Sequence, residues 1–280
     1  MAGCAIRTEA GRGPGTGPTP GAPARPIDGP SHPIDAPVHP IDAPGTSEAA
    51  WRAWPGLAAL PPASVAGWAS AVIFAAHPDD EVLGAGGSIA LLAAAGARLR
   101  VVAVTDGEAS HPGRAEAARA ELARRRAQER TAALQALGAD RAEVIRLGLP
   151  DAAEGAWEAE LAARVPELTA GFAACLAPWV SDLHADHEAV GRAACRAAGP
   201  VLFYPVWMWH WARPRDARVP WGQARRVVLT ADGQERKRAA IRCFGSQLED
   251  RGGGAGPVLT EEFAAHFRRG HEVLFPAGGP

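Results

Sequence analysis

The chain has 280 residues, enough for one large domain or two small ones with a sizeable buried core. Its 29 Lys and Arg residues nearly balance 31 Asp and Glu residues, so the net charge of −2 gives no electrostatic support for a nucleic-acid partner. Four cysteines without a C-x-x-C pair argue against a disulfide scaffold and a thiolate zinc site. With no apolar run near the roughly 18 residues of a membrane span and no signal-peptide pattern, we expect a cytoplasmic protein.

The N-terminal residues 1–46 are rich in proline and glycine, and the tripeptide Pro-Ile-Asp begins at Pro26, Pro33 and Pro40. The seven-residue period resembles a coiled-coil heptad. A proline in every repeat excludes that structure, because it removes a helical N–H and clashes with the preceding turn. We therefore expect residues 1–46 to form a disordered tail, followed over residues 47–67 by a short amphipathic helix and a linker.

Residues 68–280 are expected to form one catalytic domain of the α/β class. The predicted strands cover residues 71–76, 99–105, 143–147, 172–176 and 201–206, and the predicted helices cover residues 88–95, 114–137 and 188–198. Strands that alternate with helices are typical of a Rossmann-like, mostly parallel sheet with helices on both faces. In such a sheet, ligand sites lie at the carboxyl ends of the strands.

Two clusters of polar residues follow predicted strands at that edge. The sequence HPDDE at residues 77–81 comes directly after the first strand, and DLHADH at residues 182–187 comes between the fourth strand and a helix. One imidazole and three carboxylates within five residues exceed what helix capping requires. Because both clusters lie at the carboxyl ends of strands, we expect them to form one metal site there.

Two imidazoles and one carboxylate are a common ligand set of catalytic zinc, with open positions for water and substrate. His77, Asp80 and His187 would provide such a set. Asp79 would then lie beside the metal as a general base, and His184 would be a cationic partner for developing negative charge. Fe²⁺ can occupy similar sites, so the identity of the metal stays open.

Together with the Gly-rich sequence at residues 83–87, the two clusters resemble the PIG-L/LmbE-like family of zinc-dependent N-acetylglucosaminyl de-N-acetylases. The sequence TDGE at residues 105–108 is similar to the family's second block, and residues 126–138 are similar to the helix after it. The resemblance covers residues 68–206. It implies the ligands, base and electrostatic or acid partner named above, and a Zn²⁺-dependent hydrolysis of the N-acyl amide, expected to be N-acetyl, of a small amino-sugar glycoside.

Four further residues are candidates for the same site. By analogy Arg126 points toward it, His111 lies on a loop at its edge, and Trp207 could line its wall, so all three are candidate substrate contacts. Trp207 alternates with two more tryptophans, which in an extended segment would share one face. Asp186 would either orient His184 or cap the following helix.

Other functions fit the sequence less well. A dinucleotide-binding loop would need a third glycine at position 89, which is Ile89. A non-haem iron oxygenase uses a similar ligand set but on another scaffold, and a metallo-β-lactamase-like hydrolase would need histidine at position 182, which is Asp182. A glycan-binding protein that keeps a metal site without turnover remains an alternative, since aromatic faces pack well on sugar rings. The oligomeric state is not predicted.

Overall fold

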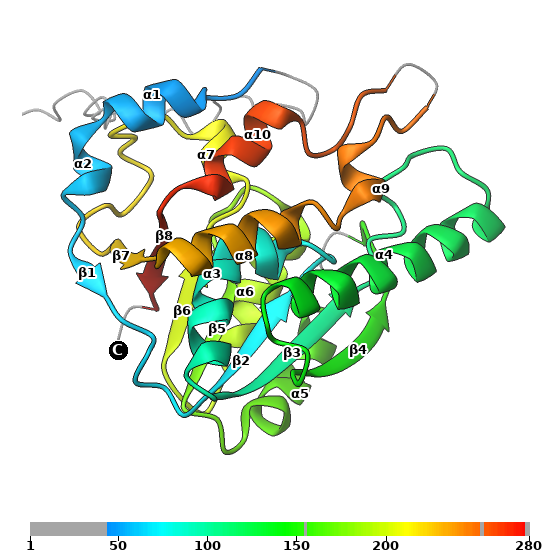
Figure 1. Ribbon diagram of the computed structural model, residues 1–280. Coiled ribbons are helices and arrows are strands. Elements are labelled where there is room, and N and C mark those ends of the chain that lie inside the picture. The colour runs from blue at the N-terminus through cyan, green and yellow to red at the C-terminus, as the bar shows by residue number, and fades with distance from the viewer. Residues whose placement is uncertain (1–43, 154–155, 253–254, 278–280) are drawn as a thin grey trace, which may run out of the picture. The chain divides into compact units, whose positions relative to one another are not determined.

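The computed structural model describes residues 44–153, 156–252 and 255–277, so residues 1–43 of the predicted tail lie outside it. Eight strands form one sheet in the order β1-β7-β8-β6-β5-β2-β3-β4 (Figure 1). The strands are β1 (Pro62–Ala63), β2 (Ser70–Ala75), β3 (Arg98–Thr105), β4 (Glu143–Leu149), β5 (Ala174–Pro178), β6 (Val201–Tyr204), β7 (Arg225–Val228) and β8 (His271–Pro276).

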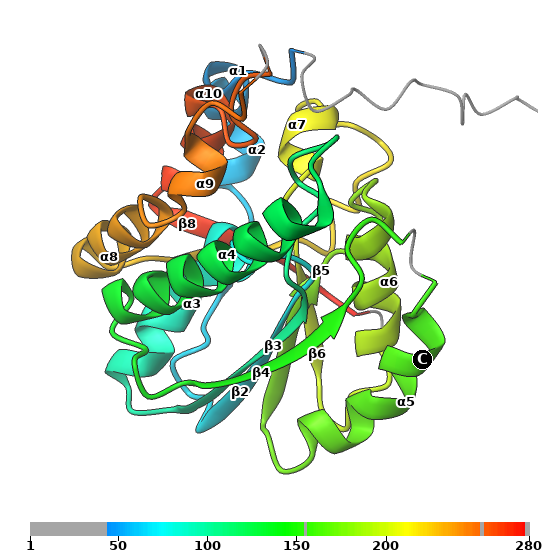
Figure 2. The same ribbon diagram turned by 90° about the vertical axis from the view of Figure 1, so that its right-hand side faces the viewer.

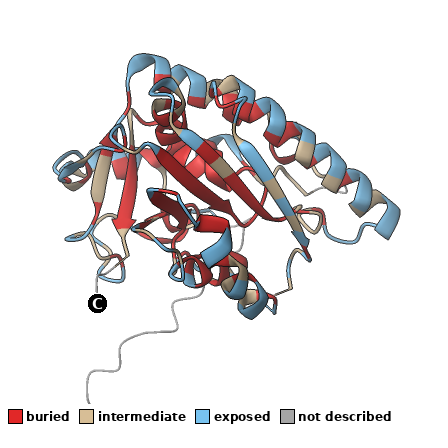
Figure 3. Ribbon diagram, turned by 90° about the horizontal axis from the view of Figure 1, so that it is seen from below, coloured by how far each residue is buried: buried red, intermediate tan, exposed pale blue. Residues whose placement is uncertain are grey.

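The centre of the sheet is built from parallel strands that are buried on both faces. All six residues of β2 and all five of β5 are buried, as their continuous apolar sequences predict. Ile73 of β2 lies opposite Val101 of β3 on one side and Leu176 of β5 on the other. The central strands therefore form the core of the domain (Figure 3).

Helices cover both faces of this sheet, which confirms the predicted α/β architecture. Helices α3, α4 and α8 pack on one face, and α5 and α6 pack on the other (Figure 2). The helices are α1 (Glu48–Ala53), α2 (Pro55–Ala58), α3 (Asp80–Ala94), α4 (Glu116–Ala136), α5 (Glu158–Thr169), α6 (Ala185–Ala194), α7 (Met208–Trp211), α8 (Ala231–Ile241), α9 (Gly245–Leu248), α10 (Glu261–Ala265) and the 3₁₀ turn η1 (His266–Arg268).

The C-terminal strand β8 is the one antiparallel element among the described strands. It lies between β6 and β7 and pairs with both in antiparallel register. It was not predicted, because its pairing brings together residues more than 40 positions apart in the sequence. The prediction of a mostly parallel sheet nevertheless holds.

Helix α3 begins eight residues earlier than predicted. Glycines lower helix propensity, so the Gly-rich stretch after the HPDDE motif did not read as helix. The structure explains the glycines by close packing. A Cβ on Gly84 would overlap the ring of Tyr204, and a Cβ on Gly87 would overlap Leu229. The Tyr204 hydroxyl donates a 2.6 Å hydrogen bond to the carbonyl of Phe74.

Helix α1 forms hydrogen bonds with residues that are distant in the sequence. Trp51 is fully buried and donates its indole N–H to the carbonyl of Trp209 at 2.9 Å. The Glu48 carboxylate accepts from the Arg269 guanidinium and lies 2.8 Å from His266 Nδ1. Burial opposes ionisation of Glu48, yet these hydrogen bonds lower its pKa to about 2. None of the helices in the described part of the chain combines the length and apolarity that a membrane crossing requires.

We expect Gly84→Ala to destabilise the domain by about 1–3 kcal/mol, because overpacking against a fixed ring outweighs the roughly 1 kcal/mol that alanine gains in helix propensity. Gly86→Ala is the matched control: its Cβ would lie 3.3 Å from Lys237 Cγ and 3.4 Å from Val82 Cγ1, without the overlap that Gly84→Ala produces. Urea unfolding of both variants measures the difference. Equal stability of the two variants would contradict the packing account.

Candidate metal and substrate site

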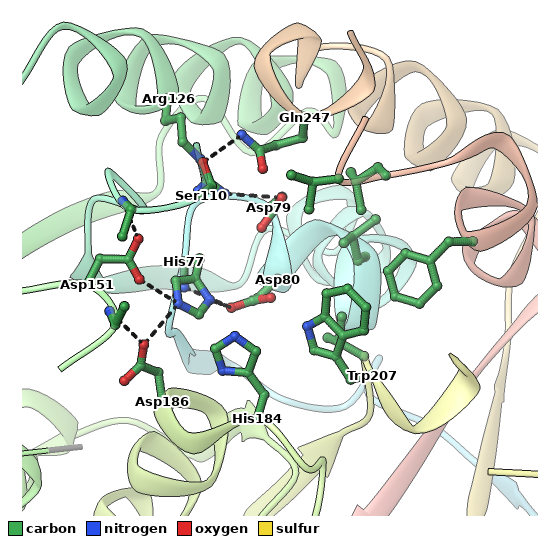
Figure 4. Close-up of a pocket in the computed structure, with 17 residues that line it drawn as sticks. His77, Asp79, Asp80, Ser110, Arg126, Asp151, His184, Asp186, Trp207 and Gln247 are labelled. Atoms are coloured by element: carbon green, nitrogen blue, oxygen red, sulfur yellow. Dashed lines mark hydrogen bonds and ion pairs between the residues drawn. The ribbon is translucent and has the colours of Figure 1, made fainter. Parts of the chain in front are cut away.

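A cavity of about 180 Å³ opens at the carboxyl ends of the strands, where both predicted clusters meet (Figure 4). Strands β2 and β5 are hydrogen-bonded neighbours, so the loops that follow them lie side by side. The residues that line the cavity are His77, Asp79, Asp80, Leu83, Ala109, Ser110, Arg126, Asp151, Ala152, His184, Asp186, Val206, Trp207, Gln247, Val258, Leu259 and Phe263.

The three predicted ligands place their donor atoms at mutual contact. His77 Nδ1 lies 3.3 Å from His187 Nε2 and 3.3 Å from Asp80 Oδ2, while His187 Nε2 lies 3.2 Å from Asp80 Oδ1. Ligand atoms around a tetrahedral Zn²⁺ ion with bonds of about 2.0–2.1 Å lie roughly 3.3 Å apart. The donor set therefore fits a small divalent cation. Nitrogens of His77, His184 and His187 also lie within 4.8 Å of one another.

Carboxylates behind the two imidazoles orient their lone pairs toward this point. His187 Nδ1 lies 2.7 Å from Asp182 Oδ2, and His77 Nε2 lies 3.2 Å from Asp151 Oδ1 and 3.3 Å from Asp186 Oδ2. A proton on each of these outer nitrogens leaves both inner nitrogens as acceptors. Two lone pairs 3.3 Å apart repel unless a proton or a cation lies between them.

The charges of this buried cluster also favour the binding of a cation. Burial opposes protonation of both imidazoles, but the surrounding carboxylates outweigh it, raising the pKa of His187 to about 9 and that of His77 well above its usual value. The site thus carries excess negative charge that protons or a divalent cation must neutralise. Metal binding displaces protons from such imidazoles.

Asp79 is buried next to the donor set in a strained backbone conformation. Its φ of 140° lies in the region that favours glycine, and non-glycine residues hold such angles chiefly at functional sites. Burial raises the pKa of Asp79 to about 7, although the Arg126 guanidinium opposes this rise. A carboxyl group with a pKa near neutrality is suited to accept and release a proton.

Arg126 holds Asp79 and the loop around it. The middle of the charged α4 surface would be expected to be solvated, yet Arg126 is only 2% exposed. Its guanidinium donates to the carbonyls of Gly107 and Pro78, each at 2.8 Å, and to Asp79 Oδ2 at 3.2 Å. These bonds use both terminal nitrogens, while Nε is buried without a hydrogen-bond partner among the described residues. Arg126 therefore positions Asp79.

His184 lines the cavity beside the donor set. Its ring lies 4.9 Å from that of His77 and 4.4 Å from that of His187 between centroids. Burial and the two neighbouring imidazoles lower its pKa well below the usual value, which favours the neutral imidazole. Its Nδ1 is buried without a hydrogen-bond partner among the described residues.

Asp186 and Asp151 both support His77. Asp186 was expected to orient His184 or to cap α6, but its Oδ2 contacts His77 Nε2 and accepts the backbone N–H of Ala152 at 3.2 Å. Asp151 was not predicted, because it follows β4 and only the fold brings it to the site. These three residues, His77, Asp151 and Asp186, form a second group whose ligand atoms lie within 4.8 Å of one another.

The predicted substrate contacts are distributed differently from expectation. His111 is 8% exposed and does not line the cavity, which its neighbour Ser110 does. Gln247, whose side chain donates to Ser110 at 3.4 Å, lines it as well. Trp207 lines the cavity as expected, and its ring stacks on that of Phe263 with centroids 4.7 Å apart.

The three alternating tryptophans do not lie on one extended face. The chain after Trp207 turns into α7, and Trp209 and Trp211 are buried in the core. The cause is Asp182, whose carboxylate accepts the backbone N–H groups of residues 206, 207 and 208 at 2.8–3.2 Å. The aromatic platform on which a glycan-binding interpretation depended is therefore not formed.

Part of the chain matches a known family. Residues 72–198 match the family model of PIG-L, described as GlcNAc-PI de-N-acetylase. Over these residues the chain is similar to the PIG-L family. The matched segment contains the three donor residues His77, Asp80 and His187. It also contains Asp79, Arg126 and His184. No curated protein matches the chain by sequence.

Solved structures share the PIG-L fold over a longer span of the chain. The A40926 pseudoaglycone deacetylase Dbv21 is 22% identical, with 74% of this chain and 96% of that protein covered at a TM-score of 0.55. A triple mutant of the deacetylase from the teicoplanin biosynthetic pathway is 21% identical, with 74% and 96% covered at 0.54. The zinc-inhibited form of teicoplanin deacetylase Orf2 is 19% identical, with 74% and 97% covered at 0.51. At these identities the likeness establishes the fold.

We expect Asp182→Asn to weaken Zn²⁺ binding by about 10–100-fold, because an amide cannot hold the His187 tautomer as a carboxylate does. Competition titration against a chromogenic chelator measures the affinity, and circular dichroism checks that the variant is folded. Asp232→Asn, at an exposed position on α8, is the control. Unchanged affinity in a folded Asp182→Asn protein would contradict the assignment of His187.

Proposed function

We propose that this protein is a divalent-metal hydrolase that removes the acyl group from the nitrogen of an amino-sugar conjugate, releasing a carboxylate and a free amine. The observation that carries the proposal is the convergence of donor atoms from three side chains, with contacts of 3.2–3.3 Å between each pair of side chains, beside a buried and strained Asp79. The PIG-L match over residues 72–198 supports the reaction class. Zn²⁺ is the proposed ion, and Fe²⁺ suits the same ligands.

His77, Asp80 and His187 would hold the ion, which supplies a Lewis acid for the amide carbonyl and a lowered pKa for water. Asp79 is the proposed general base. It accepts a proton from the attacking water, and the same proton can pass to the nitrogen as the C–N bond breaks. Arg126 keeps the Asp79 carboxylate aimed at the cavity through their 3.2 Å contact.

His184 is the proposed stabiliser of the oxygen that gains negative charge. A neutral imidazole donates one hydrogen bond, and in a buried site such a bond is worth more than in water. Because its pKa is lowered, His184 is suited to donate this bond from the N–H of a neutral ring, without bringing a positive charge into the site. The role expected from the sequence is thus kept, with hydrogen bonding in place of a fixed positive charge.

Polar groups beside the ligand set are suited to bind sugar hydroxyls. Asp151 and Ser110 line the cavity from two loops, and Gln247 lines it from α9 (Figure 4). Carboxylate and amide oxygens accept from hydroxyls, and the serine hydroxyl both donates and accepts. A hydroxyl-rich amino sugar would add hydrogen bonds to these groups, whereas an apolar amide would offer them none.

We expect Asp79→Asn to lower amine release by about 10²–10⁴-fold while metal binding persists, because asparagine fills the same space without accepting a proton. The assay measures free amine from a panel of N-acetylglucosaminyl compounds, with metal content determined on the same samples. Asp140→Asn, at an exposed position after α4, is the matched control. Activity of Asp79→Asn within tenfold of wild type would rule out Asp79 as the base.

The same panel separates hydrolysis from glycan binding without turnover. A binding protein would retain the sugar after chelation of the metal and would release no amine. A hydrolase would release amine only with the metal bound.

A further inference from the structure

The cavity has two chemically different sides. The polar side is formed by Ser110, Arg126, Asp151, Asp186 and Gln247. The apolar side, which we call the apolar wall, is formed by Leu83, Val206, Trp207, Val258, Leu259 and Phe263. Trp207 and Val258 are partly exposed there, and the other four residues are 1–4% exposed and pack behind them. An apolar cavity face beside a few polar groups is suited to an apolar ligand group.

The two aspartates of the polar side and Trp207 of the apolar wall lie on opposite flanks of the donor set. Asp151 and Asp186 lie on one flank of His77, and Trp207 lies on the other, beyond Asp80 and His184 (Figure 4). An amide group is planar, and its carbon-side and nitrogen-side substituents point away from each other. A substrate whose carbonyl lies at the donor set must therefore direct one substituent toward each side of the cavity.

The chemistry of each side assigns the substituents. An amino sugar carries hydroxyls that need partners, so it fits the side of Asp151 and Ser110, as in the function proposed above. We propose that the apolar wall binds the acyl group and that the acyl group is an aliphatic chain of about four to six carbons, longer than acetyl. This assignment rests on the proposed hydrolysis and specifies its substrate class.

The size of the wall supports a chain longer than acetyl. A single methyl group can contact only part of a surface that six side chains form, two of them aromatic. Each methylene buried there adds about 0.8 kcal/mol, which is a factor of about 4 in binding or in kcat/KM.

The wall is also held in place before any ligand arrives. The Trp207 ring stacks on Phe263 at an interplanar angle of 19°, and its backbone N–H donates to Asp182 at 2.9 Å. Leu259 is fixed by the hydrogen bond from its N–H to the carbonyl of Gln247 at 2.8 Å. A preorganised surface loses little entropy when a ligand binds.

Most of the wall lies outside the segment that identifies the family. Five of its six residues follow residue 198, where the PIG-L match ends, and only Leu83 lies within it. The donor set and Asp79 come from the matched segment. The acyl specificity therefore belongs to the C-terminal part of this chain, and the family match does not imply it.

The test uses the full chain loaded with Zn²⁺ and methyl glycosides of glucosamine that carry N-acetyl, N-butanoyl or N-hexanoyl groups. We expect kcat/KM for butanoyl to exceed that for acetyl by about 15-fold, the product of two buried methylenes. Val258→Asp, on a partly exposed loop of the wall, should reduce this ratio to near 1. Val228→Asp, at a 56% exposed position on β7, is the control and should keep it.

A parallel measurement does not depend on turnover. The affinity of Asp79→Asn protein for the same three compounds, measured by calorimetry, should rise with chain length and with a more negative heat-capacity change. If wild type releases no amine from any compound but this trend appears, the proposed hydrolysis fails and the acyl site stands. Equal affinities, or a ratio that Val258→Asp leaves unchanged, would overturn the acyl site.

A final arm varies the other end of the ligand. Butyl and hexyl glycosides of N-acetylglucosamine carry the chain on the glycosidic oxygen and not on the amide. We expect them to bind no better than the methyl glycoside. A gain in affinity with glycoside chain length and none with acyl chain length would assign the apolar wall to the aglycone and overturn the proposal.

Discussion

The site depends on one buried carboxylate, that of Asp182. It is inaccessible to solvent, it lies 2.7 Å from His187 Nδ1, and it accepts three backbone N–H groups from the segment after β6. The contact with His187 Nδ1 leaves Nε2 as the nitrogen that faces His77 and Asp80. The backbone contacts turn the chain into α7 and leave Trp207 at the cavity. A single side chain thus couples the proposed metal ligands to the apolar wall.

The donor set itself follows from the topology of the sheet. Parallel strands β2 and β5 are neighbours, so loops that are about 100 residues apart in sequence end at the same edge. This much could be predicted from two apolar runs, each followed by histidines and carboxylates. The apolar run at residues 101–104 of β3 was equally informative, because buried stretches of parallel strands have continuous apolar sequences.

Other features depend on tertiary contacts that no local pattern reports. The first half of α3 was not predicted, because glycines disfavour helix formation. Gly84 and Gly87 are present because a Cβ there would overlap Tyr204 and Leu229. Asp151 reaches His77 only through the position of β4. The extended segment expected at Trp207 fails because Asp182, 25 residues earlier, caps the turn. In each case the deciding partner is distant in sequence.

Chemistry and specificity are separated along this chain. The matched segment, residues 72–198, holds the proposed ligands and base at the edge of a parallel sheet, and the residues after it add β8, α10 and most of the apolar wall. The strained backbone of Asp79 and its contact with buried Arg126 hold the proposed base in one position. The apolar wall sets which acyl group fits beside the donor set. The C-terminal part can therefore change the substrate without changing the reaction.

The most direct test of the donor set is anomalous diffraction at the zinc absorption edge, from crystals of the full chain grown with Zn²⁺. We expect one dominant peak about 2.0–2.2 Å from His77 Nδ1, His187 Nε2 and an Asp80 oxygen. A dominant peak at the second group, between His77 Nε2, Asp151 and Asp186, or no peak at either place, would contradict the account.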